Sequence, residues 1–347
     1  MNKVLITDIR TRMPMAIRRL PWLTRLYRCA FHPQQTTRRA ELLLHLPLQK
    51  LFRICRQLYR VPQCGAFSYQ RFNQSRTVRF NAGNLQFHAL YSVTYAHGYE
   101  QENAVLIDLL LPEGGTFYDI GSNWGSFTLY AASNHTHLAI HAFEPFPSSY
   151  ADLVNCVQQA GLADFVTSHN CALSNQDGES SIWLPDQMHS GLAKLSTEAG
   201  ATRILTRRLD SLRLTPPDLI KMDVEGHEIE VFRGGRETLQ TSWPFLIFEN
   251  QRDYDVPAKT LDPLTFLTQL GYRLYIPSLR RSSGSFDYFL PCGFQQEIHR
   301  MQVIEPQDCF ALIPLEPRER FVHQYDLNIF ACHDSRQPQL RSVFSEC

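Results

Sequence analysis

Short apolar runs alternate with amphipathic stretches along the chain from residue 99 onward. The runs are rich in aromatic and branched residues, which is typical of buried strands, and the stretches between them repeat apolar positions with the period of a helix. The predicted strands are 116–121, 138–145, 165–173, 217–224, 244–250, 273–277 and 309–314, and the predicted helices are 99–115, 124–134, 148–162, 228–240 and 261–272. This alternation predicts an α/β fold built on a doubly wound, mostly parallel sheet.

The ends of the chain do not follow this pattern. Residues 66–98 favour two short strands, 76–80 and 85–92, with "NAGN" as the turn between them. Residues 278–307 resemble a loop insertion between the last two strands, and the tail after Pro317 is polar. We therefore expect an N-terminal extension (1–65), a domain (66–317, with its core at 99–250) and a C-terminal tail (318–347).

Charge sets the N-terminal extension apart from the rest. Residues 1–65 hold 13 lysines and arginines against Asp8 and Glu41, a net charge of +11, whereas the remainder holds 21 basic and 32 acidic residues. Its arginines alternate with apolar residues, as in short amphipathic helices. Such helices could pack on the domain, or contact an anionic membrane surface or an acidic partner. The acidic domain itself argues against nucleic acid as a partner.

The cysteines and the N-terminal residues favour a cytoplasmic location. The basic segment would add peripheral contact with the inner face of the membrane. The nine cysteines form no CxxC pair, so neither a disulfide framework nor a zinc ribbon is expected. Asp8, Arg10 and Arg12 interrupt the first apolar residues, so the start lacks the unbroken apolar region of a signal peptide. No apolar stretch approaches the roughly 20 residues that span a bilayer.

A glycine turn follows the first strand of the α/β series, in "TFYDIGSNWGSF". Gly121 and Gly125 would let a ligand approach the backbone closely. A dinucleotide fingerprint would place its first glycine where this chain has Asp119. Because a carboxylate repels a pyrophosphate and attracts a cation, a nicotinamide oxidoreductase is disfavoured. S-adenosylmethionine (SAM), which carries a sulfonium and an amino group and no phosphate, suits the site better. Glu144, at the end of the next strand, suits the ribose hydroxyl groups.

Acid and base groups gather after the strand 217–224, in "DVEGHE". Asp223 and Glu225 could orient an acceptor or hold a divalent cation such as Mg²⁺, and His227 could act as a general base. Glu249 adds a carboxylate at the end of the next strand. Asp223 and Glu249 are the candidate metal ligands. Alternatively, the glutamates only favour a helix N-terminus and His227 is a solvated surface residue.

These segments resemble the FkbM family of SAM-dependent methyltransferases, through "FYDIGSNWGSFTLYAA", "IHAFEPFPSSYADLVNCV", "LIKMDVEGHEIEVFRGGRETL" and "PFLIFEN". The resemblance covers roughly residues 99–250. It implies a class I methyltransferase (Rossmann-like) fold, with a seven-stranded sheet whose last strand is antiparallel. It also implies SAM as the methyl donor and a hydroxyl group as the usual acceptor, often on a sugar or a polyketide-like product.

The resemblance also assigns roles to residues at matching positions. The methionine side of SAM would be lined by Asp119, Gly121, Ser122, Asn123 and Gly125; the ribose would be bound by Glu144; the adenine would face Asn170, Cys171 and Ala172; and the acceptor would face Asp223, Glu225 and His227. Trp124 departs from the small or aliphatic residue that is usual in the family. It would narrow the donor site or pack under the helix.

Three functions are consistent with these features. The leading hypothesis is an O-methyltransferase that acts on a hydroxyl group of a sugar, glycan or glycolipid-type acceptor. A second keeps SAM as the donor and takes a small secondary metabolite with a hydroxyl, amine or carboxylate group. A third, of another class, is a non-catalytic scaffold that keeps only the SAM pocket.

Overall fold

The computed structural model describes the domain core and parts of both ends of the chain. The described residues are 15–20, 22, 50–51, 54–55, 64–82, 84–90, 99–183, 194–195, 202–289, 308–323 and 326–344. Most of the basic extension and most of the insertion predicted at 278–307 lie outside this part. Among the described residues, no helix combines the length and the apolar character needed to cross a membrane.

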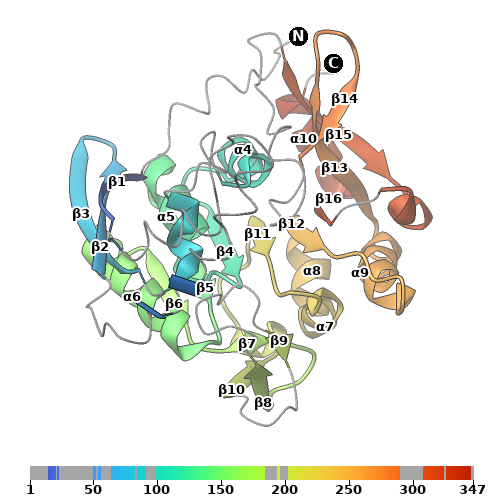
Figure 1. Ribbon diagram of the computed structural model, residues 1–347. Helices are drawn as coiled ribbons and strands as arrows, with labels where there is room; N and C mark the ends of the chain where they lie inside the picture. Colours follow the sequence, from blue (N-terminus) through green and yellow to red (C-terminus); the bar gives the residue numbers. More distant parts are fainter. Residues whose placement is uncertain are drawn as a thin grey trace.

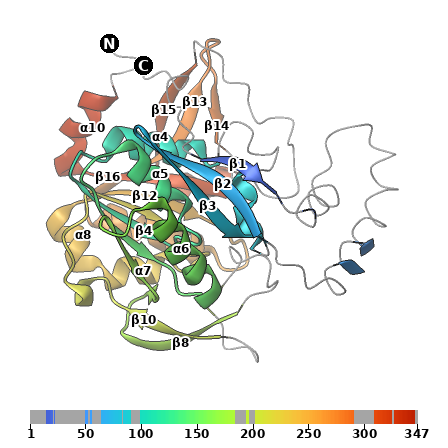
Figure 2. The ribbon, with the colours of Figure 1, turned by 90° about the vertical axis from the view of Figure 1, so that its left-hand side faces the viewer.

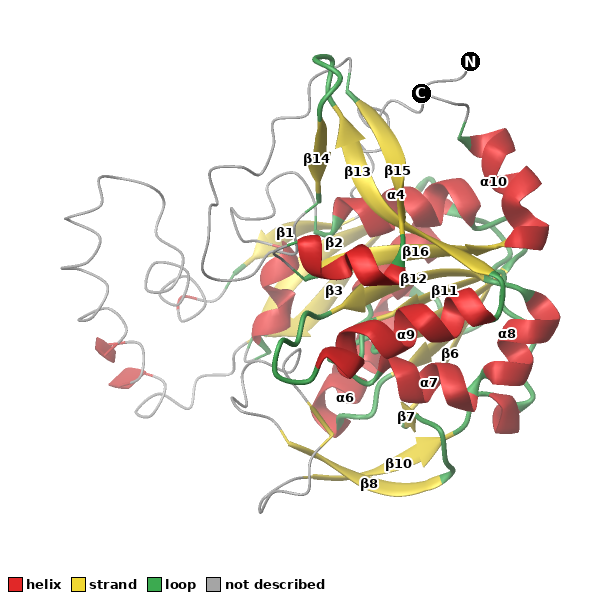
Figure 3. Cartoon of the chain, turned by 90° about the vertical axis from the view of Figure 1, so that its right-hand side faces the viewer, coloured by secondary structure: helices red, strands yellow, loops and turns green. Residues whose placement is uncertain are grey.

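One large sheet organises the domain (Figures 1 and 3). Seven of its strands lie in the order β6-β5-β4-β11-β12-β16-β13. Their bounds are β4 Thr116–Ile120, β5 Ala139–Phe143, β6 Val166–His169, β11 Leu219–Met222, β12 Phe245–Asn250, β13 Tyr272–Arg280 and β16 Leu327–His333. The strands from β6 to β12 are mutually parallel, and β16 runs antiparallel to both β12 and β13. The predicted class I methyltransferase fold is confirmed.

Helices cover both faces of this sheet. Successive residues of each strand point to opposite sides, and apolar residues on both sides pack against these helices. Phe117 of β4 packs among apolar side chains of α4, α5 and α6, whereas Tyr118 packs on the side of α7, α8 and α9. The helices are α4 Gln101–Leu110, α5 Ser126–Asn134, α6 Pro147–Ala160, α7 Glu228–Gly234, α8 Arg236–Ser242 and α9 Pro257–Gln269. With both faces covered, the open positions lie at the strand ends, where the candidate site residues were predicted.

The helix predicted at 228–240 is two helices, α7 and α8, which meet at Gly234 and Gly235. A Cβ atom on Gly234 would lie 1.9 Å from the carbonyl oxygen of Ser174. This close approach of two backbones requires glycine there.

A separate three-stranded sheet precedes the domain core (Figure 2). It consists of β1 Met15–Arg19, β2 Cys64–Arg71 and β3 Gln74–Asn81, which pair antiparallel in that order. The helical prediction for the basic extension is therefore wrong for residues 15–19. These residues form the edge strand β1, and Nη1 of Arg18 donates to Oγ1 of Thr77 at 3.1 Å.

The strand predicted at 85–92 is also wrong, since residues Leu85–Leu90 form the 3-10 helix η1. The side chain of Asn84 accepts a hydrogen bond from the backbone N–H of Gln86 at 3.0 Å. Such a local bond starts a turn in place of an extended strand.

The C-terminal part of the sheet extends beyond the predicted strands. β13 continues to Arg280 and pairs with β14 Phe286–Tyr288 and β15 Cys309–Leu315, so the start of the predicted insertion is a β-hairpin. β16 comes from the tail that was predicted to lie outside the domain. Because β16 lies between β12 and β13, the domain includes the tail at least to His333. The last helix is α10 Gln337–Val343.

A small sheet of four strands follows β6 and was not predicted. It consists of β7 Ala172–Leu173, β8 Gly178–Trp183, β9 Lys194–Leu195 and β10 Thr202–Arg207, in the order β7-β10-β8-β9. It lies below the carboxyl ends of β5 and β6 in the view of Figure 1. A strand such as β10, with one buried face and several polar residues, gives a weak signal in the sequence.

Candidate active site

The glycine turn after β4 is wedged between two neighbouring strands. The N–H groups of Gly121 and Ser122 both donate to the carbonyl oxygen of Phe143, at 2.9 and 3.0 Å. Gly121 has a φ of +75°, and a Cβ atom there would lie 1.8 Å from the carbonyl oxygen of Asp223. This position therefore requires glycine. The turn and the end of β11 touch each other, which brings the predicted donor and acceptor groups together.

Asp119 is buried at the end of β4 and faces the start of α5. Its Oδ2 accepts hydrogen bonds from the N–H and Oγ1 of Thr128, at 3.0 and 2.7 Å. Its Oδ1 is buried and has no hydrogen-bond partner among the described residues. Burial raises the pKa of this carboxyl group, against the lowering effect of Lys221. A buried acceptor without a donor is costly, so Asp119 fits a ligand that brings a donor or a cation.

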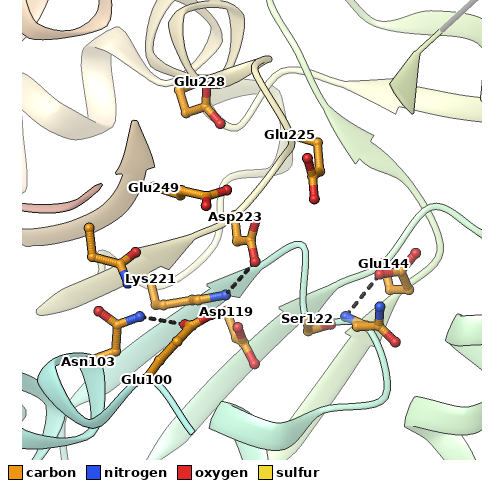
Figure 4. Close-up of polar contacts among 12 residues, drawn as sticks. Glu100, Asn103, Asp119, Ser122, Glu144, Lys221, Asp223, Glu225, Glu228 and Glu249 are labelled. Atoms are coloured by element: carbon orange, nitrogen blue, oxygen red, sulfur yellow. Dashed lines mark hydrogen bonds and ion pairs between the residues drawn. The ribbon is translucent and has the colours of Figure 1, made fainter. Parts of the chain in front are cut away.

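Glu144 lies at the end of β5, directly across from the glycine turn (Figure 4). Its carboxylate accepts the N–H of Asn123 at 2.9 Å and the N–H of Phe146 at 2.8 Å. Burial raises its pKa to about 7, although these two backbone bonds lower it. Because a carboxylate has about four acceptor positions, two backbone bonds leave room for a ligand.

The three residues predicted to face the adenine separate into two environments. Asn170 donates from Nδ2 to the carbonyl oxygens of Glu144 and Pro145, at 2.9 and 3.2 Å, so it joins the ends of β5 and β6. Cys171 and Ala172 are buried, and Ala172 begins β7 of the small sheet. Burial raises the pKa of the Cys171 thiol to about 11.

The structure brings three carboxylates together at the ends of β11 and β12. One oxygen each from Asp223, Glu225 and Glu249 lies within 4.8 Å of the others. Gln251 donates from Nε2 to Glu225 at 2.6 Å and to Glu249 at 3.5 Å. Burial and the charges of Asp223 and Glu225 raise the pKa of Glu249 well above its usual value. We call these three residues the carboxylate cluster.

His227 does not join this cluster. Its Nε2 lies 2.9 Å from Oγ of Ser174, which follows the small strand β7. Burial lowers its pKa, which favours the neutral ring. Its neighbour Glu228 is also buried and bonds the N–H of Gly226 at 3.1 Å, so this glutamate fixes the turn into α7.

Two charged residues that the sequence did not single out, Lys221 and Glu100, complete the site. Lys221 is buried within β11, and its Nζ lies 3.5 Å from Oδ2 of Asp223 (Figure 4). Burial lowers its pKa, but the charges of Asp223, Glu100 and Asp119 together outweigh this effect and raise it. Glu100, before α4, is held by Asn103 at 2.7 Å. A lysine inside an apolar strand was the available signal, since a buried charge needs partners.

Trp124 packs in the hydrophobic core beside η1 and the N-terminal sheet. It is 2% exposed, its ring stacks 4.6 Å from that of Phe87, and its Nε1 donates to the carbonyl oxygen of Gln86 at 3.1 Å. Of the two predicted effects, packing is the one observed. The glycine turn is thereby attached to η1 and to the N-terminal sheet.

The strand order defines a class I methyltransferase fold, and the glycine turn and the carboxylate cluster lie at the ends of its strands. Residues 118–274, a little under half of the chain, match the methyltransferase FkbM domain. It is 34% identical over 151 residues to the hexuronic acid methyltransferase AglP of Haloferax volcanii, which covers 42% of this chain and 60% of that protein.

Two further similarities involve shorter parts of the relatives or weaker structural agreement. The 31-O-demethyl-FK506 methyltransferase FkbM of Streptomyces tacrolimicus is 33% identical over 115 residues, 30% of this chain and 38% of that protein. The solved structure of the methyltransferase FkbM from Methylobacillus flagellatus superposes with a TM-score of 0.40 at 16% identity, covering 72% of this chain and 53% of that one. The chain thus spans 60% or less of the curated relatives named here.

Proposed function

We propose that the protein transfers a methyl group from SAM to a hydroxyl group of a sugar, glycan or glycolipid-type acceptor. The observation that carries this proposal is the contact between the glycine turn and the end of β11, where Gly121 meets the carbonyl oxygen of Asp223. This contact sets the donor turn directly beside the carboxylate cluster. Methyl transfer needs donor and acceptor groups in line and close together.

The charges of the site support SAM as the donor. Asp119, Glu100 and Asp223 surround one cation, Lys221, and Glu144 lies at the next strand end. This excess of carboxylates favours a donor that carries an ammonium and a sulfonium, and it disfavours a dinucleotide with its pyrophosphate. Asp119 and Ser122–Asn123 would bind the methionine end, Glu144 would accept from the ribose, and Asn170 with Cys171 and Ala172 would border the adenine.

The carboxylate cluster would orient the acceptor hydroxyl and take its proton. Bound SAM supplies an electrophilic methyl group, and the acceptor hydroxyl must lose its proton as the new bond forms. Asp223, Glu225 and Glu249 would orient that hydroxyl, and one of them would accept its proton. The same three oxygens could instead hold a divalent cation. Asp223 and Glu249 would then bind the ion, and the ion would bind the acceptor. His227, bonded to Ser174, would support the turn.

Two relatives suggest two kinds of acceptor. The similarity to a hexuronic acid methyltransferase favours a sugar hydroxyl. The similarity to an FK506 methyltransferase favours a hydroxyl on a small metabolite as the second candidate. Both acceptors require the same donor site and the same kind of group to take the proton. Selection between them would depend only on the residues that surround the carboxylate cluster.

Methyl transfer from isotope-labelled SAM to a panel of neutral sugars, uronic acids and macrolide alcohols tests the proposal. We expect label in a sugar, and a loss of about 100-fold or more in Asp223→Asn, because general acid–base catalysis contributes at least about that factor. Asp177→Asn, which changes an exposed carboxylate bonded to Ser211, is the control and should keep full activity. Label only in a macrolide alcohol would replace the sugar acceptor with the second candidate. Bound SAM without transfer to any acceptor would favour a scaffold.

Contact with an anionic membrane through residues 1–65 stays a prediction. Each basic residue near such a surface contributes up to about 1 kcal/mol. Sedimentation with vesicles of anionic lipid at low salt measures this contact, and a chain without residues 1–14 should sediment less.

A further inference from the structure

Large apolar side chains are exposed on two segments that meet beyond the end of β12. Tyr254 is 63% exposed, Val256 is 44% exposed and Val322 is 77% exposed. The ring of Phe321 lies 5.5 Å from that of Tyr254, at an interplanar angle of 31°. We call these four residues the aromatic shelf. Several large apolar side chains exposed in one place mark a binding surface more often than an accident of packing.

The shelf is held rigidly by a buried arginine. Arg320, adjacent to Phe321, is fully buried and donates from Nε to Oδ1 of Asn250 at 2.7 Å and from Nη2 to the carbonyl oxygen of Asn250 at 2.6 Å. On the other segment, the N–H of Arg252 donates to Asp326 at 2.7 Å. The segment of Arg320 is thus fixed to the end of β12, and the segment of Arg252 is fixed to the residue before β16. Burying a guanidinium is costly, so we infer that the buried Arg320 is kept because it fixes the position of the shelf.

The same attachments place the shelf next to the carboxylate cluster. Asn250, which Arg320 grips, directly follows Glu249 in β12. Gln251 comes next and binds both Glu225 and Glu249. The shelf is therefore attached to the strand end that carries Glu249.

We propose that Tyr254 and Phe321 form an acceptor subsite that stacks on the apolar face of a sugar ring, beside the ring whose hydroxyl is methylated. The proposal rests on the function proposed above and names the part of the chain that selects the acceptor. The axial C–H groups of a pyranose form an apolar face that packs on an aromatic ring, and its hydroxyl groups remain at the edge. Gln251 and the carboxylate cluster offer acceptors and donors at that edge.

The size and charge of the shelf favour a sugar over a protein partner. A stable protein interface buries about 800 Å² on each side, which two rings and two valines do not provide. The guanidinium of Arg252 lies over one face of the Tyr254 ring, 4.4 Å from its centroid, so a sugar would stack on the opposite face. This guanidinium also donates to the carbonyl oxygen of His323 at 3.2 Å. A cation beside the ring favours a sugar that carries a carboxylate over a neutral one.

The shelf also lies partly outside the matched domain. Tyr254 falls within residues 118–274, whereas Phe321 falls beyond them. Donor binding therefore belongs to the domain as matched, and the shelf combines it with a segment beyond the match. Such a combination suits a surface that determines acceptor specificity.

Saturation-transfer NMR with methyl glucuronide and methyl glucoside tests the subsite, because the two probes differ only in the carboxylate. We expect transfer to the ring C–H protons of both, stronger for the glucuronide. Tyr254→Ala and Phe321→Ala should each reduce it by about fivefold. Tyr254→Leu, which keeps apolar surface without an aromatic face, should reduce it as well. Phe72→Ala is the matched control, since Phe72 is 57% exposed beside Arg71 in the β2–β3 turn.

Calorimetric titration of the same variants with SAM separates this proposal from the proposed function. SAM should bind every shelf variant as tightly as it binds the unaltered protein. If neither sugar shows transfer to the unaltered protein, or if both alanine variants keep full transfer, the subsite is wrong while SAM binding still supports a methyltransferase. If SAM itself does not bind, the proposed function fails independently of the sugar result.

Discussion

At the scale of single residues, one buried cation balances the carboxylates of the site. Lys221 lies in the apolar strand β11, 3.5 Å from Asp223, and its ring contact with Phe127 is 5.0 Å from Nζ to the centroid. Glu100 and Asp119 add to the charges that favour the protonated amine. Removing one member of a buried charge group leaves the others uncompensated, which costs more than the pair itself contributes.

Lys221→Met should therefore destabilise the protein strongly. We expect the free energy of unfolding to fall by about 3–5 kcal/mol, because three carboxylates would lose their cation. Urea denaturation at neutral pH measures the change. Lys259→Met is the matched control: Lys259 pairs with Asp253 at 3.3 Å with 61% of its side chain exposed, and such surface pairs contribute little. Equal stabilities of the two variants would contradict the buried charge balance.

Glu144 gives donor binding a pH dependence. Burial raises its pKa to about 7, and the ionised form accepts from ribose hydroxyl groups and attracts a cationic donor better than the protonated form. The Kd for SAM should therefore fall as the pH rises from about 6 to about 8. For stability the sign is opposite, since a raised carboxyl pKa contributes stability at low pH that is lost as the pH rises through about 7.

Glu144→Gln should bind SAM more weakly and should lose this pH dependence, as measured by calorimetry at several pH values. The amide keeps the size of the side chain and cannot ionise. An unchanged slope in this variant would assign the titration to another group and contradict the role of Glu144.

At the scale of elements, the N-terminal sheet and η1 brace the donor turn. The ring of Phe87 lies between Trp124, with centroids 4.6 Å apart, and Phe80, at 4.7 Å. Asn84 donates to Asp152 of α6 at 3.0 Å and lies 3.5 Å from Oδ1 of Asn123. Asn123 has a φ of +50°, a conformation that needs support from its surroundings.

Trp124 allows the brace to be tested in steps. Trp124→Ala should lower the free energy of unfolding by about 3–5 kcal/mol, because it leaves a cavity beside Phe87. Trp124→Phe keeps an aromatic ring against Phe87 but loses the bond to Gln86 and part of the buried volume, so we expect a smaller loss of about 1–2 kcal/mol. Thermal denaturation ranks the variants, and calorimetry should show weaker SAM binding in the order Trp, Phe, Ala. Unchanged SAM binding in a folded Trp124→Ala variant would show that the turn needs no brace.

The sequence predicted those elements whose signal is local. β4, β11 and β12 are apolar runs that end in acidic residues, so both the strands and the positions of Asp119, Asp223 and Glu249 could be inferred. The turn at Asn84, which starts η1, depends on a side chain that bonds the backbone, and the apolar pattern does not show it. Lys221 reads as one polar residue within a strand, and its carboxylate partners come from the end of its own strand, from β4 and from the segment before α4.

At the scale of the whole molecule, the domain closes through a strand that comes late in the chain. β16 lies between β12 and β13 and pairs with β12 through Leu327–Ala331 and with β13 through Phe330–His333. Asn328 in β16 donates to the buried Glu102 of α4 at 2.7 Å, so the tail also contacts the element that precedes the site. The apolar residues of Leu327–His333 have the pattern of a strand, but the polar residues on both sides led to the prediction of a tail. Only the order of strands in the sheet shows that this strand is internal.

A chain that ends after residue 317 should therefore not fold. Without β16, the edges of β12 and β13 lose their hydrogen-bond partners, and buried side chains such as Ile329 and Phe330 are missing from both faces of the sheet. A chain that ends after residue 344 is the control and should fold normally. Circular dichroism and size-exclusion chromatography of the two chains measure this difference, and a folded, monodisperse chain ending at 317 would contradict the internal position of β16.

Calorimetric titration of the purified protein with SAM, its demethylated product and NAD tests the central claim most directly. The acidic donor site predicts that SAM and its demethylated product bind and that NAD does not, because Asp119 and Glu144 attract a cation and repel a pyrophosphate. Asp119→Asn should weaken SAM binding by about tenfold or more, since Oδ1 of Asp119 is the buried acceptor that the donor would satisfy. Binding of NAD in preference to SAM, or SAM binding that Asp119→Asn leaves unchanged, would contradict a methyl-donor site at the end of β4.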